Sequence, residues 1–114
     1  MRDDLSRLKD ILEAIYQIEK YQPPIFEDLI SNELVQIWII HYIQEIGEAS
    51  AGMSPGFRLQ YPQIPWRQII DMRNLLVHQY FGVDPHEVWN AVISDLPTLK
   101  ASIVKIIDEI SPSR

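Results

Sequence analysis

The sequence of 114 residues contains no cysteine, so it can form neither disulfides nor thiolate metal sites. Glycine is scarce as well, with only 4 residues, and this scarcity favours helices over a domain rich in turns. The longest apolar run, WIIHYI, is too short to cross a bilayer. The first residues, MRDDLSRLKD, lack the apolar region of a signal peptide. These absences predict a soluble cytoplasmic protein without a membrane partner.

Positive charge is also in short supply, since the net charge is −6. Proteins that bind nucleic acid broadly present a basic face, which this composition argues against. Residues 57–80 are the exception, because they sum to +2 and leave −8 for the rest of the chain. Such a region can hold one phosphate group, but not a long duplex. Its charged residues are Arg58, Arg67, Asp71 and Arg73.

Apolar residues, which make up 46% of the chain, recur mostly at helical spacing. The length is that of one domain covering residues 1–114. We therefore predict an all-α fold, an antiparallel bundle of about five helices with short links. The expected segments are helices at 3–21, 25–31, 33–53 and 66–80, a loop at 54–64, a helix capped by Asp84, and a last helix restarted by Asp95 and Pro97.

The expected helix at 33–53 is apolar around nearly its whole circumference. Such a helix needs two apolar environments. In a domain of this size one is the core and the other is a partner chain, so we predict a homodimer. Gly47 lies inside this helix and costs about 1 kcal/mol relative to alanine. It therefore predicts a close helix crossing.

The stretch RNLLVHQY at 73–80 gathers Arg73, Asn74, His78 and Tyr80. At about 100° per residue, Asn74 and His78 share one helix face, and Arg73 and Tyr80 share another. One straight helix therefore does not bring all four side chains together. Either the helix breaks near His78 or a second chain completes the site.

These residue types suit cleavage of RNA by transesterification. His78 can exchange protons with a ribose hydroxyl or a leaving oxygen. Arg73 can fork onto phosphate oxygens where charge develops. Asn74 can hold the imidazole tautomer or bind the phosphate, and Tyr80 offers a phenol that can donate or be modified. The chemistry requires no metal and no cofactor, and the three histidines lack metal-ligand spacing.

A purely structural interpretation stands beside the catalytic one. Cations near a helix C-terminus are also favoured by the helix dipole. The pattern RxxxxHxY by itself is not specific. By the same reasoning His41 is a core or interface residue and His86 a surface residue of a first helical turn. The three tryptophans are packing residues.

Three stretches occur in a specific order: IGEAS at 46–50, YPQIPWRQIIDMRNLLVHQYFGVDPHEVW at 61–89 and LPTL at 96–99. In this order the sequence resembles the HepT-like family of HEPN-domain proteins, the toxins of HepT/MntA-type (type VII) toxin–antitoxin modules. The resemblance covers most of the chain. It departs at LVQIWIIHYIQE, where the family often has a more polar pattern with an arginine, so Trp38 and His41 belong to the differing part.

The resemblance implies a homodimeric helical bundle with two RxxxxHxY motifs near the dimer cleft. It implies a metal-independent endoribonuclease that uses Arg73 and His78, with Asn74 in support. It also implies a cognate MntA-like nucleotidyltransferase antitoxin that transfers AMP from ATP, with Mg²⁺, to Tyr80.

Two other functions remain open from the sequence. In one, the chain is a non-catalytic partner subunit of a nucleotidyltransferase, and Arg73 and His78 only bind a nucleotide or phosphate. The acidic composition favours this alternative. In the other, the chain is a structural dimerisation module.

Overall fold

The computed structural model describes residues 3–78 and 83–111, and within these ranges every regular element is a helix. The predicted all-α class is therefore confirmed. None of the described helices has both the length and the sustained hydropathy needed to cross a bilayer. The helices are α1 (Asp4–Tyr21), α2 (Phe26–Ile30), α3 (Glu33–Ala51), α4 (Pro55–Gln60), α5 (Trp66–His78), α6 (Pro85–Asn90), the π-helical turn η2 (Ala91–Asp95) and α7 (Leu96–Ile110).

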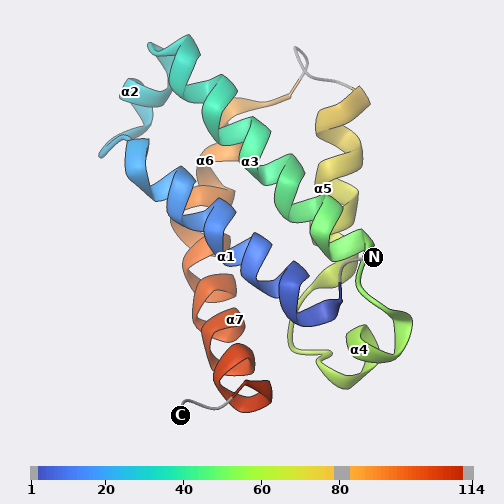
Figure 1. Cartoon of the computed structure of the whole chain (residues 1–114). Helices are drawn as coiled ribbons and strands as arrows, with labels where there is room; N and C mark the ends of the chain where they lie inside the picture. The colour runs from blue at the N-terminus through green and yellow to red at the C-terminus, as the bar shows by residue number, and fades with distance from the viewer. Residues whose placement is uncertain (1–2, 79–82, 112–114) are drawn as a thin grey trace.

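The long helices alternate in direction along the chain (Figure 1). α3 returns beside α1, α5 runs back beside α3, and α6 and α7 lead down to the C-terminal end. α3 packs against both α1 and α5, and α1 also packs against α7. The predicted antiparallel bundle is thus confirmed, with α3 between α1 and α5.

α1 follows from a cap and an apolar stripe. The carboxylate of Asp3 accepts a hydrogen bond from the backbone N–H of Ser6 at 2.8 Å, which caps the first turn. The helix ends at Tyr21, because Pro23 disfavours helical geometry at the preceding residue. The buried side chains recur at helical spacing, as expected for the predicted helix at 3–21. They are Leu8, Ile11, Ala14, Ile15 and Ile18.

One side of α3 is buried in the core, and the exposed side is apolar only near the start of the helix. Its exposed stripe begins with Leu34 and Ile37, which are 79% and 43% exposed, and continues with His41, Glu45 and Glu48. Within one chain, the uncovered apolar surface of α3 therefore lies in its first turns. The buried residues of α3 are Ile39, Ile40, Ile43, Ile46, Gly47, Ala49 and Ser50.

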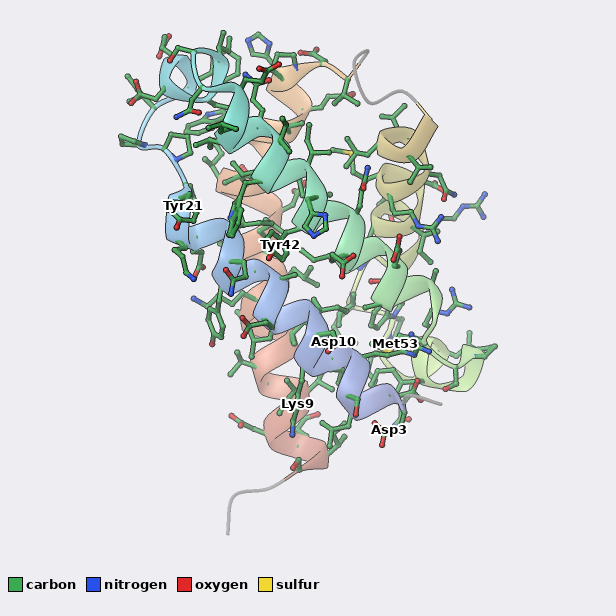
Figure 2. The ribbon with its side chains drawn as sticks, turned by 45° about the horizontal axis from the view of Figure 1, so that its top comes forward. Asp3, Lys9, Asp10, Tyr21, Tyr42 and Met53 are labelled. Atoms are coloured by element: carbon green, nitrogen blue, oxygen red, sulfur yellow. The ribbon has the colours of Figure 1, made fainter. Side chains whose placement is uncertain are left out.

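Trp38 ties α3 to α1. Its indole Nε1 donates to the backbone carbonyl of Gln17 at 2.6 Å. Its ring makes edge contacts with Tyr21 and Tyr42, labelled in Figure 2, at centroid distances of 4.9 and 5.0 Å. Trp38 is thus a packing residue, as the sequence indicated. His41, by contrast, is exposed rather than in the core of the chain.

The predicted loop at 54–64 is wrong in part, because α4 occupies Pro55–Gln60. Ser54 caps this helix by accepting from the N–H of Phe57 at 3.3 Å, and Pro55 fills the first position. Proline and glycine in this stretch suggested a loop. However, proline after a serine cap is a helix start.

The last two helices form one continuous run instead of the predicted restart at Asp95 and Pro97. η2 joins them, and the N–H of Leu96 donates to the carbonyl of Ala91. Pro97 has no N–H and its ring crowds the preceding turn. A wide π turn just before it lets the helix continue. The predicted cap at Asp84 is confirmed, with the N–H of His86 as its donor at 2.9 Å.

Candidate functional site

The N-terminal end of α5 is fixed by Trp66. Its indole Nε1 donates to the backbone carbonyl of Tyr61 at 3.1 Å, and the side chain is only 7% exposed. Leu76 is fully buried and anchors the other half of the helix. These two anchors set the rotation of α5, so that Arg73 points towards α3.

Gly47 marks the crossing of α3 and α5 at Arg73. A Cβ atom added to Gly47 would lie 2.2 Å from Cβ and 2.7 Å from Cγ of Arg73. Real Cβ atoms essentially never approach other atoms so closely, and here the obstruction is the root of the side chain rather than its flexible end. The predicted close crossing is therefore confirmed, and its partner is the candidate catalytic arginine.

One nitrogen of the Arg73 guanidinium group donates a hydrogen bond, whereas another has no acceptor among the described residues. Its Nη1 donates to the side-chain oxygen of Asn74 at 2.8 Å. Its Nε is buried and has no hydrogen-bond partner among the described residues. A buried donor without an acceptor is costly, and such groups in native proteins often mark functional sites.

The structure places part of the predicted site. Arg73 and Asn74 are brought together directly, whereas the sequence paired Asn74 with His78. The backbone of His78 ends α5, but its side chain and all of Tyr80 lie outside the described residues. Their roles therefore stay predictions. No group of three or more His, Asp or Glu side chains in the described ranges is arranged to hold a metal ion.

The chain re-enters the described part next to a capped helix. The Asp84 carboxylate accepts from the backbone N–H of His86 and lies 3.2 Å from its Nδ1. The backbone bond and then the side-chain bond lower the pKa of Asp84 below its ordinary value. The His86 ring rests on Phe26 with centroids 4.2 Å apart, which links α6 to α2. His86 is exposed, as predicted.

Comparison with known proteins identifies the family to which the chain belongs. Residues 11–106 match the family described as ribonuclease HepT-like, a range that includes Gly47, Arg73, Asn74, His78 and Tyr80. The chain belongs to this HepT-like family. The resemblance read from the motifs is thereby confirmed over most of the sequence.

Relatives of this HepT-like chain are similar over nearly its full length. A Thermococcus cleftensis protein named "Probable ribonuclease HepT" is 41% identical over 106 residues, which is 92% of this chain and 96% of the relative. A Methanocaldococcus jannaschii protein named "Putative RNase" is 33% identical over 90% of this chain and 94% of its own length. No solved structure matches at a significant level.

A third relative, also from M. jannaschii, is a longer protein. It is named "Gamma-glutamylcyclotransferase and putative RNase" and is 38% identical over 116 residues. The alignment covers all of this chain but only 52% of that relative. A HepT-like domain of this length thus also occurs as about half of a larger protein.

Sequence reasoning missed the pairing of Gly47 with Arg73. The two residues are 26 positions apart, and each was singled out for a different reason. The only signal was the glycine inside a helical pattern, which predicts a close crossing but not the element that crosses.

Proposed function

We propose that this HepT-like protein is an endoribonuclease toxin of a type VII toxin–antitoxin module, acting in the cytoplasm. The observation that carries the proposal is the Arg73 guanidinium. It is set in place by Gly47 and Asn74 and has a buried Nε without an acceptor among the described residues. Membership of a family described as ribonuclease HepT-like supports phosphate as the missing acceptor.

In the proposed reaction His78 takes the proton from a ribose 2′-hydroxyl. The freed oxygen attacks the adjacent phosphorus, and the bond from phosphorus to the 5′-oxygen of the next nucleotide breaks. That oxygen takes up a proton from water, and His78 returns its proton to water, leaving a cyclic phosphate end and a 5′-hydroxyl end. Arg73 stabilises the charge that builds on the phosphate oxygens. No metal ion and no cofactor takes part in these steps.

A homodimer completes the site in this proposal. The uncovered apolar residues Leu34 and Ile37 on α3 support a partner surface, and Val77 adds a half-exposed apolar side chain on α5. An isologous dimer uses the same patch on both chains. Two copies of the motif then lie near one cleft, as the family resemblance implies.

The proposed antitoxin is an MntA-like nucleotidyltransferase that transfers AMP from ATP to the hydroxyl of Tyr80. The tyrosine oxygen attacks the α-phosphorus of ATP as a base of the partner takes its proton, and pyrophosphate leaves. The partner also binds the Mg²⁺. The attached phosphate would compete with RNA for Arg73. Mass spectrometry after incubation with the partner and Mg-ATP should show whole AMP increments on Tyr80. Increments on another residue would contradict this step.

The decisive experiment compares the protein with a His78→Ala variant on total RNA in the presence of EDTA. Cleavage by the wild type, reduced roughly 10²–10⁴-fold in the variant, is expected for loss of a positioned acid–base group. Circular dichroism of both proteins controls for folding. Intact RNA after incubation with folded wild type would contradict the ribonuclease proposal.

One alternative has an observation in its favour. The net charge of −6 suits a non-catalytic subunit that binds a nucleotide or phosphate for a nucleotidyltransferase. In that case RNA stays intact in the same experiment, while Arg73→Ala weakens binding of a nucleotide.

A further inference from the structure

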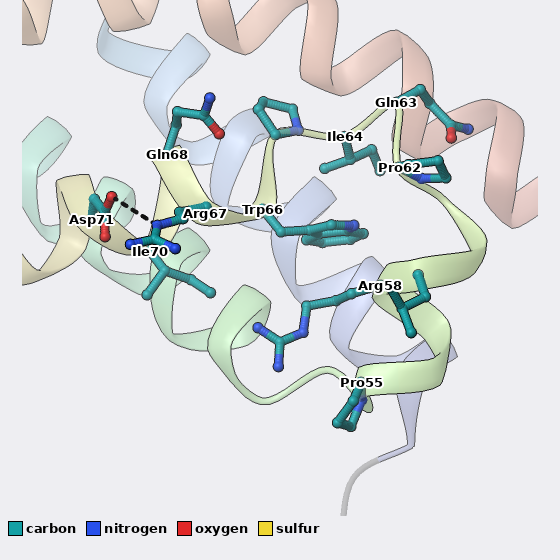
Figure 3. A pocket seen from close by; sticks show the side chains of 12 residues that line it. Pro55, Arg58, Pro62, Gln63, Ile64, Trp66, Arg67, Gln68, Ile70 and Asp71 are labelled. Carbon is teal, nitrogen blue, oxygen red and sulfur yellow. Dashed lines mark ion pairs between the residues drawn. The ribbon is translucent and has the colours of Figure 1, made fainter.

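A hollow lined by two arginines lies between α4 and the start of α5 (Figure 3). It is open to solvent and has a volume of about 850 Å³. Arg58 reaches into it from α4, and Arg67 reaches into it from α5. The remaining lining residues are mostly apolar or uncharged, with Asp71 as the one acid.

α4, the helix that carries Arg58, is held in place by contacts with neighbouring segments. The carboxylate of Asp4, on α1, accepts from both the N–H and the hydroxyl of Ser54, at 2.9 and 2.7 Å. The ring of Phe57 packs against Tyr61 with centroids 4.8 Å apart. α4 is therefore tied to α1 and to the start of α5, which holds Arg58 at the edge of the hollow.

Arg67 is available to a ligand. Its Nε lies 3.9 Å from a carboxylate oxygen of Asp71, and the two side chains are 90% and 66% exposed. An exposed ion pair at this separation contributes little and is readily exchanged. A phosphate offers the same planar guanidinium two oxygen acceptors for a bidentate pair.

Arg67 lies about two helical turns before Asn74, the residue that contacts the candidate catalytic arginine. Arg67 and Asn74 are seven positions apart, which returns α5 to nearly the same face about 10 Å further along its axis. Asn74 holds the Arg73 guanidinium. Since stacked nucleotides rise about 3.4 Å each, this separation corresponds to about three nucleotides of one strand.

We infer that the Arg58–Arg67 hollow binds backbone phosphates of a single RNA strand that flank the cleaved phosphate. This inference rests on the proposed ribonuclease function and adds a second contact region to it. It also explains how a chain of net charge −6 can hold RNA, because two arginines line this one hollow. Trp66 is buried, so it offers no stacking platform for a base.

Binding of a non-cleavable probe tests the inference separately from catalysis. The probe is a fluorescent twelve-nucleotide 2′-O-methyl RNA, which lacks the attacking hydroxyl, and anisotropy is measured over a series of salt concentrations. An Arg58→Gln/Arg67→Gln double variant should bind more weakly. Its plot of log affinity against log salt should be shallower by about 1.4, the slope expected for two lost contacts to a single strand.

Matched controls separate the hollow from net charge. Lys9→Gln/Lys105→Gln removes the same charge from exposed positions on α1 and α7 and should leave the slope unchanged. Asp71→Asn should tighten binding, whereas Asp108→Asn on α7 should not. Equal slopes for the wild type and the arginine double variant, or equal effects of each variant and its control, would overturn the inference.

The two proposals fail in distinguishable ways. If unmodified RNA stays intact but the double variant still loses affinity for the probe, the hollow binds RNA and the ribonuclease proposal is wrong. If RNA is cleaved through His78 but the double variant binds the probe like the wild type, the ribonuclease proposal stands and the hollow is not part of it.

Discussion

At the scale of single residues, the lack of a side chain at Gly47 determines where Arg73 lies. Gly47 gives the root of the arginine side chain room that no other residue leaves. The guanidinium then extends to Asn74, on the exposed side of α5. The candidate catalytic arginine is thus positioned by the absence of a side chain on a neighbouring helix.

A Gly47→Ala variant should be destabilised by about 1–3 kcal/mol, because overpacking displaces Arg73 or separates α3 from α5. Helix propensity alone predicts the opposite sign, a gain of about 1 kcal/mol. Urea denaturation measures the difference in the free energy of unfolding. RNA cleavage, if present, should fall as well.

Gly56→Ala is the matched control, since a Cβ there would meet no atom within 4 Å. It lies in α4 and should be neutral or slightly stabilising. If Gly47→Ala behaves like Gly56→Ala, the close crossing does not constrain Arg73.

At the scale of elements, the sequence predicted the helices whose apolar spacing is regular. The bounds of α1 and α3 follow from caps and stripes at Asp3 and Asn32. α4 was missed because proline and glycine obscured a serine cap. η2 was missed because hydropathy records which residues are apolar but not how many residues close one helical turn.

The candidate site was predictable to a smaller extent. The sequence singled out Arg73 and Asn74 and gave the amide two possible partners, the imidazole of His78 at i,i+4 spacing or a bound phosphate. The bond from the Arg73 guanidinium to its immediate neighbour depends on how α3 confines the arginine. Such tertiary confinement is not encoded in spacing along one helix.

The cap of α6 gives a pH-dependent prediction. The pKa of Asp84 is lower in the folded chain, chiefly because the backbone N–H of His86 donates to it. Its contribution to stability is therefore present above the unfolded pKa of about 4 and is lost as pH falls through the folded value. The difference in unfolding free energy between wild type and Asp84→Asn should be constant near neutral pH and shrink below about pH 4.

Chemical denaturation at several pH values between neutral and acidic measures this difference. Asp108→Asn, at an exposed position of α7, provides the control. A difference for Asp84→Asn that grows on acidification would contradict the prediction.

At the scale of the whole molecule, charge and apolar surface are distributed unequally. Arg58, Arg67 and Arg73 lie on α4 and α5, while the uncovered apolar residues Leu34 and Ile37 lie at the start of α3. The proposed substrate surface and the proposed partner surface can therefore be altered separately. The structure also distinguishes two neighbouring isoleucines, because Ile39 is fully buried and Ile37 is 43% exposed.

A Leu34→Glu/Ile37→Glu variant should be a folded monomer if the homodimer uses this surface, because charge is costly at an apolar interface but not in solvent. Light scattering gives the mass, and circular dichroism gives the helix content. Ile39→Glu should instead lower the stability of the chain itself. A wild-type monomer at micromolar concentration, or a double variant that still dimerises, would exclude this surface.

The π turn at η2 has a consequence for insertions and deletions. A ring closed by i→i+5 bonds contains one residue more than a ring of a regular α-helix. Removing one residue from Ala91–Asp95 would therefore restore regular winding without rotating α7 relative to α6. Elsewhere in the run at 85–110 the same deletion would turn the buried face of α7 by about 100°. A one-residue gap in this family is thus best tolerated directly before Pro97.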